Sequence, residues 1–122
     1  DVIDTIRFPR SVSDEGGSIT GEIAALNRIL DITVAETRGQ GGTIVIPGHG
    51  RLYDEADVAE YRDMVTIIRD RVQNAVAKGS SLAELQASQP VLDYAGVFGA
   101  PGSDWTGDDF VEAIYLQLKG AQ

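Results

Sequence analysis

The 122-residue sequence predicts an α/β fold in one domain that spans residues 1–122. Two short segments are rich in β-branched residues and end at proline, as strands do. Longer segments repeat apolar residues every three or four positions, which is typical of amphipathic helices. Because the two kinds of segment alternate along the first half of the chain, we expect a sheet covered by helices. A chain of this length can bury one hydrophobic core and not two.

The first expected strand covers residues 2–8, where Val2, Ile3, Ile6 and Phe8 supply β-branched and aromatic side chains. Pro9 ends it because proline has no amide proton to donate to a neighbouring strand. Residues 9–18 then predict a loop, since they are rich in Ser, Asp, Glu and Gly.

The first expected helix begins at Ile19, directly after the capping residue Ser18, and runs for about 15 residues. We expect it to fade near residues 36–38. Its apolar positions recur at helical spacing, and its other positions form a polar face to which Glu22 is assigned. The apolar positions are Ile19, Ile23, Leu26 and Leu30, and the polar face carries Glu22, Asn27, Arg28 and Asp31.

The second expected strand is Thr43-Ile44-Val45-Ile46, which follows the glycine-rich connector at residues 39–42. Its side chains are apolar on both faces, which is typical of a central strand buried on both sides. Pro47-Gly48-His49-Gly50 then forms a turn at the carboxyl end of this strand.

Three helices are expected in the second half of the chain. The first is capped by Asp54, has apolar residues at alternating spacings of four and three, and ends at Gly79. A short helix follows the cap Ser80-Ser81 and ends at Pro90, and an irregular stretch extends to Asp104. The last helix begins at Thr106 or Asp108 and carries Phe110, Ile114 and Leu118. Two strands cannot cover these helices, so either further strands escape the pattern or another segment or chain supplies them.

Composition excludes several classes of protein. A formal net charge of −9 disfavours binding to nucleic acid, which requires clustered basic residues. The absence of cysteine excludes disulfide scaffolds, zinc fingers and thiol nucleophiles. No apolar run is long enough to cross a bilayer. The opening residues lack the features of a signal peptide, and their strand-like pattern suggests that the natural amino terminus lies upstream.

His49 is the single histidine of the chain and stands between two glycines after a buried strand. Ligand-binding residues of α/β proteins occupy such positions, although an isolated histidine in a turn is more often structural or solvated. A catalytic zinc takes about three protein ligands, so the histidine cannot form a site alone.

Other candidate sites have simpler explanations. No Gly-x-Ser-x-Gly elbow supports a serine hydrolase, and the connector at residues 39–42 precedes a strand instead of linking a strand to a helix. The carboxylates at residues 54–57 are accounted for by the helix dipole. Asp93, Tyr94 and Trp105 could border a pocket, but aromatic residues in such a segment more often pack on the core.

Residues 43–50, followed by a loop and a helix that contains Tyr61-Arg62-Asp63-Met64, resemble the carboxyl-terminal half of a hydrolase of the metallo-β-lactamase superfamily. The Pro-Gly-His-Gly turn is similar to the last metal-binding motif of that superfamily. The resemblance extends over nearly the whole chain. It includes residues 17–19, 25–30, 54–58 and 110–113.

The resemblance implies half of a four-layer αββα sandwich with one or two zinc ions at the edge between its halves. His49 matches the last metal ligand, and Asp1 matches the bridging aspartate more weakly. The His-x-His-x-Asp-His motif of the family is missing from the sequence and would lie upstream. The resemblance therefore implies a hydrolase that uses a metal-bound hydroxide on a small-molecule substrate, and a chain that is inactive without the amino-terminal half as its partner.

A second hypothesis treats the chain as a stand-alone interaction module. Two strands with amphipathic helices would leave an apolar sheet face uncovered, and such surfaces usually mark interfaces. A homodimer or another chain would cover it.

Overall fold

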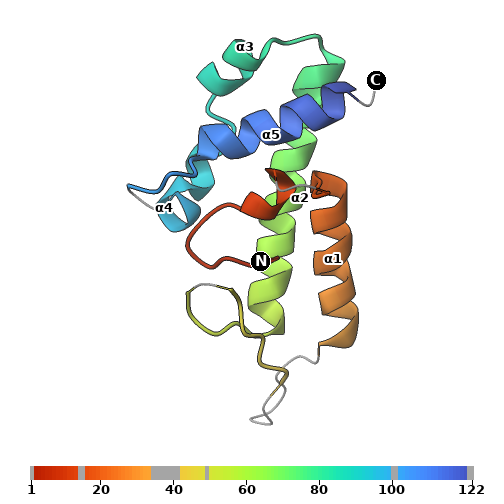
Figure 1. Cartoon of the computed structure of the whole chain (residues 1–122), viewed down its shortest axis with the longest axis vertical. Helices are drawn as coiled ribbons and strands as arrows, with labels where there is room; N and C mark the ends of the chain where they lie inside the picture. The colour runs from red at the N-terminus through yellow and green to blue at the C-terminus, as the bar shows by residue number, and fades with distance from the viewer. Residues whose placement is uncertain (1, 14–15, 34–41, 49, 100–101, 121–122) are drawn as a thin grey trace.

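A computed structural model describes residues 2–13, 16–33, 42–48, 50–99 and 102–120 of the chain. Helices dominate these residues (Figure 1). The longer ones are α1 (Ile19–Ile32), α2 (Glu55–Ala77) and α5 (Gly107–Gly120). The shorter ones are η1 (Arg10–Ser13), α3 (Leu82–Ala87), η2 (Leu92–Tyr94) and α4 (Ala95–Phe98).

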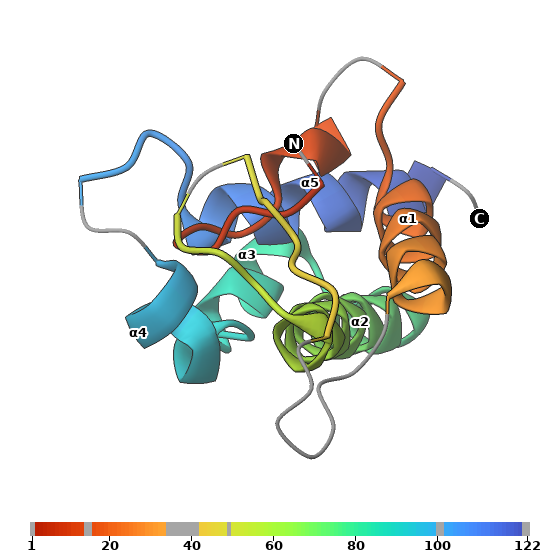
Figure 2. The same ribbon diagram turned by 90° about the horizontal axis from the view of Figure 1, so that it is seen from below.

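The helix α2 is the centre of the fold. Figure 1 shows α1 running beside it and α5 crossing it, and Figure 2 shows α2 along its axis with α1 on one side. Its buried positions recur every three or four residues, so one continuous apolar stripe faces the neighbouring elements. That stripe consists of Val58, Tyr61, Met64, Val65, Ile68, Val72 and Val76.

The predicted helix boundaries are confirmed where capping residues define them. Asp54 accepts a hydrogen bond from the amide of Asp57 at 2.9 Å, while the Asp57 carboxylate accepts one from the amide of Asp54 at 3.0 Å. Ser81 and Glu84 form the same reciprocal box at the start of α3. Gly79 follows the C-cap residue Lys78 of α2. Its φ of 78° is the left-handed conformation that ends many helices.

The beginnings of α1 and α5 also agree with the sequence prediction. Ser18 Oγ accepts a hydrogen bond from the amide of Gly21, and Thr106 Oγ1 accepts one from the amide of Asp109. The sequence predicts that the first helix fades near residues 36–38, which lie outside the described residues, but α1 already ends at Ile32, and its C-cap Thr33 is extended.

The α/β prediction, including half of an αββα sandwich, is wrong for the part of the chain that the structure describes. Those residues contain no sheet, and both predicted strands are reduced to isolated bridges. Arg7 pairs with Gly99, and Val45 pairs with Tyr53. A strand needs a neighbour along its length to satisfy its amide and carbonyl groups, and neither segment has one here. Ile3 and Val45 from these segments still pack in or against the core, whereas Ile6, Ile44 and Ile46 are exposed.

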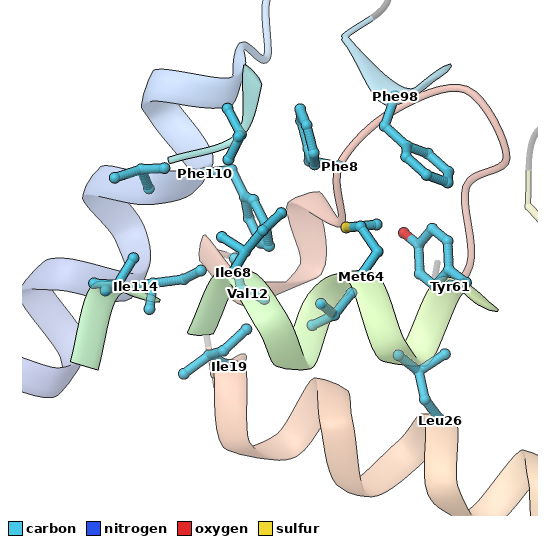
Figure 3. Packing of buried hydrophobic residues seen from close by; sticks show 14 of the residues in the cluster. Phe8, Val12, Ile19, Leu26, Tyr61, Met64, Ile68, Phe98, Phe110 and Ile114 are labelled. Atoms are coloured by element: carbon cyan, nitrogen blue, oxygen red, sulfur yellow. The ribbon is translucent and has the colours of Figure 1, made fainter. Parts of the chain in front are cut away.

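Aromatic rings close the core above α2 (Figure 3). Phe8 from the amino-terminal segment stacks on Phe110 from α5, with the ring centroids 5.3 Å apart. Phe98 contacts Phe8 from a second side and meets Tyr61 edge to face at 5.5 Å. The amino-terminal segment is therefore held in the core by a side chain that is only 1% exposed.

None of the helices in the described parts of the chain is both long and apolar enough to cross a membrane.

Replacing the central ring tests this packing. We expect Phe8→Ala to lower the free energy of unfolding by about 3–5 kcal/mol, because it removes the ring and leaves a cavity between α5 and Phe98. Urea denaturation followed by circular dichroism measures the change. Leu92→Ala is the matched control, since Leu92 is 63% exposed. Equal losses in the two variants would contradict the described core.

Candidate functional site

The turn that contains His49 lies within a loop closed by one pair of residues. The amide of Val45 donates to the carbonyl of Tyr53 at 2.8 Å, and the amide of Tyr53 donates to the carbonyl of Val45 at 2.9 Å. Tyr53 is buried, and Val45 packs against the core. This pair therefore anchors both ends of the loop to the protein.

The loop is attached to the amino-terminal segment on both sides of His49. The amide of Gly48 donates to the carbonyl of Ile3 at 3.1 Å, and the amide of Arg51 donates to Thr5 Oγ1 at 3.1 Å. Ile3 and Thr5 are themselves buried. The flanks of the turn are thus held by a segment that belongs to the core.

Gly50 is required at its position by two separate constraints. Its φ of 93° lies in the left-handed region that side chains rarely adopt. A Cβ atom added there would also lie 1.3 Å from Thr5 Oγ1. The close contact between the turn and Thr5 is therefore possible only because residue 50 is a glycine.

Asp4 is the carboxylate nearest to this contact in the sequence, but its oxygens are already engaged. One accepts from the amide of Ile6 at 3.1 Å and the other from Arg7 Nε at 2.9 Å. Its side chain is 10% exposed. Asp4 therefore shapes the segment and is not available as an open ligand.

Arg51 links the loop to α2. Its guanidinium binds both carboxylate oxygens of Asp57, at 2.8 and 3.0 Å, and lies 4.8 Å from the centre of the Tyr53 ring. The hydrogen bonds from Arg51 lower the pKa of the Asp57 carboxyl to about 2, with burial acting in the opposite direction. Asp54 and Asp57 are thus occupied in capping and pairing, which agrees with their place at a helix start.

The two predicted metal ligands, His49 and Asp1, both lie outside the described residues. The structure instead describes what flanks them, and it brings these flanks together through the contacts of Gly48, Gly50 and Arg51 with residues 3–5. Among the described residues, no group of three or more His, Cys, Asp or Glu side chains could hold a metal ion. This part of the chain therefore does not contain a complete metal site.

The outer side of the loop is apolar and exposed. Ile44, Ile46 and Leu52 are 66%, 80% and 57% exposed, whereas Val45 and Tyr53 face inward. Alternate residues of an extended segment point to opposite sides, so these three side chains form an outer apolar face. The sequence predicts that residues 43–46 are buried on both sides, but in the described part of the chain Ile44 and Ile46 are exposed.

A separate pocket of about 310 Å³ lies between the amino-terminal segment and the start of α5. Trp105 lines it, and Phe8, Val91 and Asp108 contribute apolar and acidic surface. The other candidates for a pocket rim have different roles, because Asp93 pairs with Arg71 at 2.8 Å and Tyr94 lies beneath the same guanidinium. This pocket contains none of the residues that flank His49.

The burial of Glu22 is not predicted from the sequence. The sequence-based prediction places Glu22 on the polar face of α1, and it is wrong, because the side chain is only 5% exposed. The signal was its spacing, since Glu22 lies three residues after Ile19 and four before Leu26, within the apolar stripe.

Comparison of the chain with family models, with curated proteins and with solved structures finds no match.

The contact at Gly50 leads to a direct test. We expect Gly50→Ala to destabilise the protein by several kcal/mol more than Gly16→Ala, because Gly16 has a similar φ of 79° but open space around its Cα. Urea denaturation of both variants separates the steric conflict with Thr5 from the cost of the left-handed backbone. Similar stabilities would show that the turn does not pack on residues 3–5.

Proposed function

We propose that this chain contributes one side of the metal centre of a metal-dependent hydrolase, with His49 as a zinc ligand and Asp1 as a second. The substrate is a small molecule. The proposal rests on the resemblance of the Pro-Gly-His-Gly turn to a metal-binding motif and on the way the flanks of that turn are held.

The attachment of the turn to residues 3–5 is the observation that carries the proposal. Asp1 precedes Ile3 by two residues, and His49 directly follows Gly48. The 3.1 Å hydrogen bond between Gly48 and Ile3 therefore joins segments that adjoin both candidate ligands in the sequence. A carboxylate and an imidazole are both ligands that zinc accepts.

This chain supplies too few ligands to form a complete catalytic zinc site by itself. Asp1 and His49 are two ligands, whereas a catalytic zinc takes about three from protein. The remaining ligands must then come from another polypeptide segment, and the chain alone is expected to be inactive. That segment is the amino-terminal half implied by the resemblance.

The outer apolar face formed by Ile44, Ile46 and Leu52 is a suitable place for this segment. It lies on the same loop as His49, and apolar side chains exposed together usually mark an interface. A partner that covers this face would bring its own ligands close to the turn. The proposal concerns this site only and retains nothing of the αββα architecture, which the helical fold overturns.

Zinc binding tests the assignment of the ligand. We expect His49→Ala to reduce the zinc affinity of the chain at least about tenfold, because it removes the imidazole and leaves one carboxylate. Native mass spectrometry during a zinc titration measures the bound ion and the oligomeric state together. Asp63→Asn is the control, since that carboxylate is on the exposed side of α2. Unchanged zinc binding in His49→Ala would reject the assignment.

The exposed apolar face also supports a second candidate, a non-catalytic module that binds a second copy or another chain. In that case Ile46→Lys should abolish assembly without altering zinc binding, whereas Val97→Lys, on another exposed surface, should have no effect. Sedimentation velocity measures the assembly. A monomer at all concentrations would exclude the homodimer.

The reading frame upstream of the Asp1 codon separates the two candidates. A His-x-His-x-Asp-His segment encoded there is expected for the hydrolase, and a start codon directly before Asp1 is expected for the module.

A further inference from the structure

Glu22 is a carboxyl group placed within an apolar interface. It lies on the side of α1 that carries the buried residues Ile19 and Leu26, and this side packs against α2 and η1. Glutamate is rarely buried to this extent unless it is paired with a basic group. No ion pair joins Glu22 to a lysine or arginine within the described ranges.

Only one of the two carboxyl oxygens of Glu22 has a partner. Ser11 Oγ, from η1, donates to Oε2 at 2.6 Å, while Oε1 is buried without a hydrogen bond. The Tyr61 hydroxyl, from α2, is likewise buried without one. A buried polar atom with no partner costs about 1–3 kcal/mol, and more when it is charged. The ionised form of Glu22 is therefore poorly accommodated.

The groups around Glu22 offer little compensation for a negative charge. Burial raises the pKa of Glu22 to about 7, and the hydrogen bond from Ser11 offsets only part of the increase. Burial also raises the pKa of Tyr61 well above its ordinary value, so the phenol stays neutral. Asp4, the other carboxylate close enough to affect Tyr61, is paired with Arg7.

We propose that Glu22 is a proton-dependent switch for the packing of α1: the neutral acid holds α1 against η1 and α2, and loss of the proton loosens this contact. The neutral carboxyl keeps the Ser11 hydrogen bond and places no charge between the helices. The ionised carboxylate keeps the same bond but must leave a charged oxygen unpaired in the interface, or draw it toward water by moving α1.

The direction of the pH effect follows from the two states of the protein. The unfolded chain releases the Glu22 proton near pH 4.5, whereas the packed protein keeps it until about pH 7. The packed form is therefore most stable below pH 4.5 as far as Glu22 is concerned, and it loses stability as the pH rises toward 7. The full difference corresponds to about a 300-fold change in the equilibrium between the folded and the unfolded chain.

Three proteins test the switch, namely the wild type, Glu22→Gln and Glu60→Gln. The glutamine side chain introduced by Glu22→Gln cannot ionise and still accepts from Ser11, and Glu60 is an exposed glutamate of α2. Urea denaturation between pH 5 and 8 should show the wild type and Glu60→Gln losing stability with rising pH relative to Glu22→Gln. The same pH dependence in all three proteins would overturn the proposal.

Two further measurements on the wild type do not depend on whether a variant folds. The carboxyl carbon of Glu22, followed by NMR, should titrate with a midpoint near pH 7, and a midpoint near 4.5 would overturn the proposal. Amide hydrogen exchange, corrected for its intrinsic pH dependence, should become faster in α1 than in the centre of α2 as the pH rises. Equal changes in both helices would contradict a switch local to α1.

Discussion

Burial of the apolar stripe of α2 is the interaction on which the other elements depend. An isolated amphipathic helix is only marginally stable in water, so α2 persists because α1 and α5 cover its stripe. The same contacts help to fix α1 and α5, which also pack against η1. The reciprocal capping of Asp54 and Asp57 determines where α2 begins, and hence which residues remain in the preceding loop.

The amino-terminal segment transmits this packing to the loop that contains His49. Phe8 places the segment in the aromatic core, and Ile3 and Thr5 then bind the backbone on either side of the histidine. Arg51 adds a second attachment through Asp57 at the start of α2. The loop thus depends on two elements far apart in the sequence, which is a common way for a rigid scaffold to position a functional residue.

The described residues contain two features that conflict with simple burial rules. Ile44, Ile46 and Leu52 leave apolar surface in water, and Glu22 places a carboxyl group among apolar side chains. Natural sequences depart from such rules mainly at functional or strained positions. The first feature is adjacent to the candidate metal-binding turn, and the second lies in the contact between α1 and the centre of the fold. The first feature bears on the proposed binding site, and the second on the proposed protonation of Glu22.

The sequence by itself determined α1, α2, α3 and α5, because their signals are local, whereas the short helices η1, η2 and α4 lie in segments for which it predicts a loop or irregular structure. Capping residues such as Ser18, Asp54 and Ser81 satisfy amide groups three residues away, and the spacing of apolar residues defines the buried side of each helix. It also identified Asp54 as the residue that caps α2. Only the tertiary structure decided whether residues 2–8 and 43–46 form a sheet, because a strand requires a partner that its own residues cannot specify. The same is true of the burial of Glu22 and of the contact between Gly50 and Thr5, which arise between segments that meet only in the folded chain.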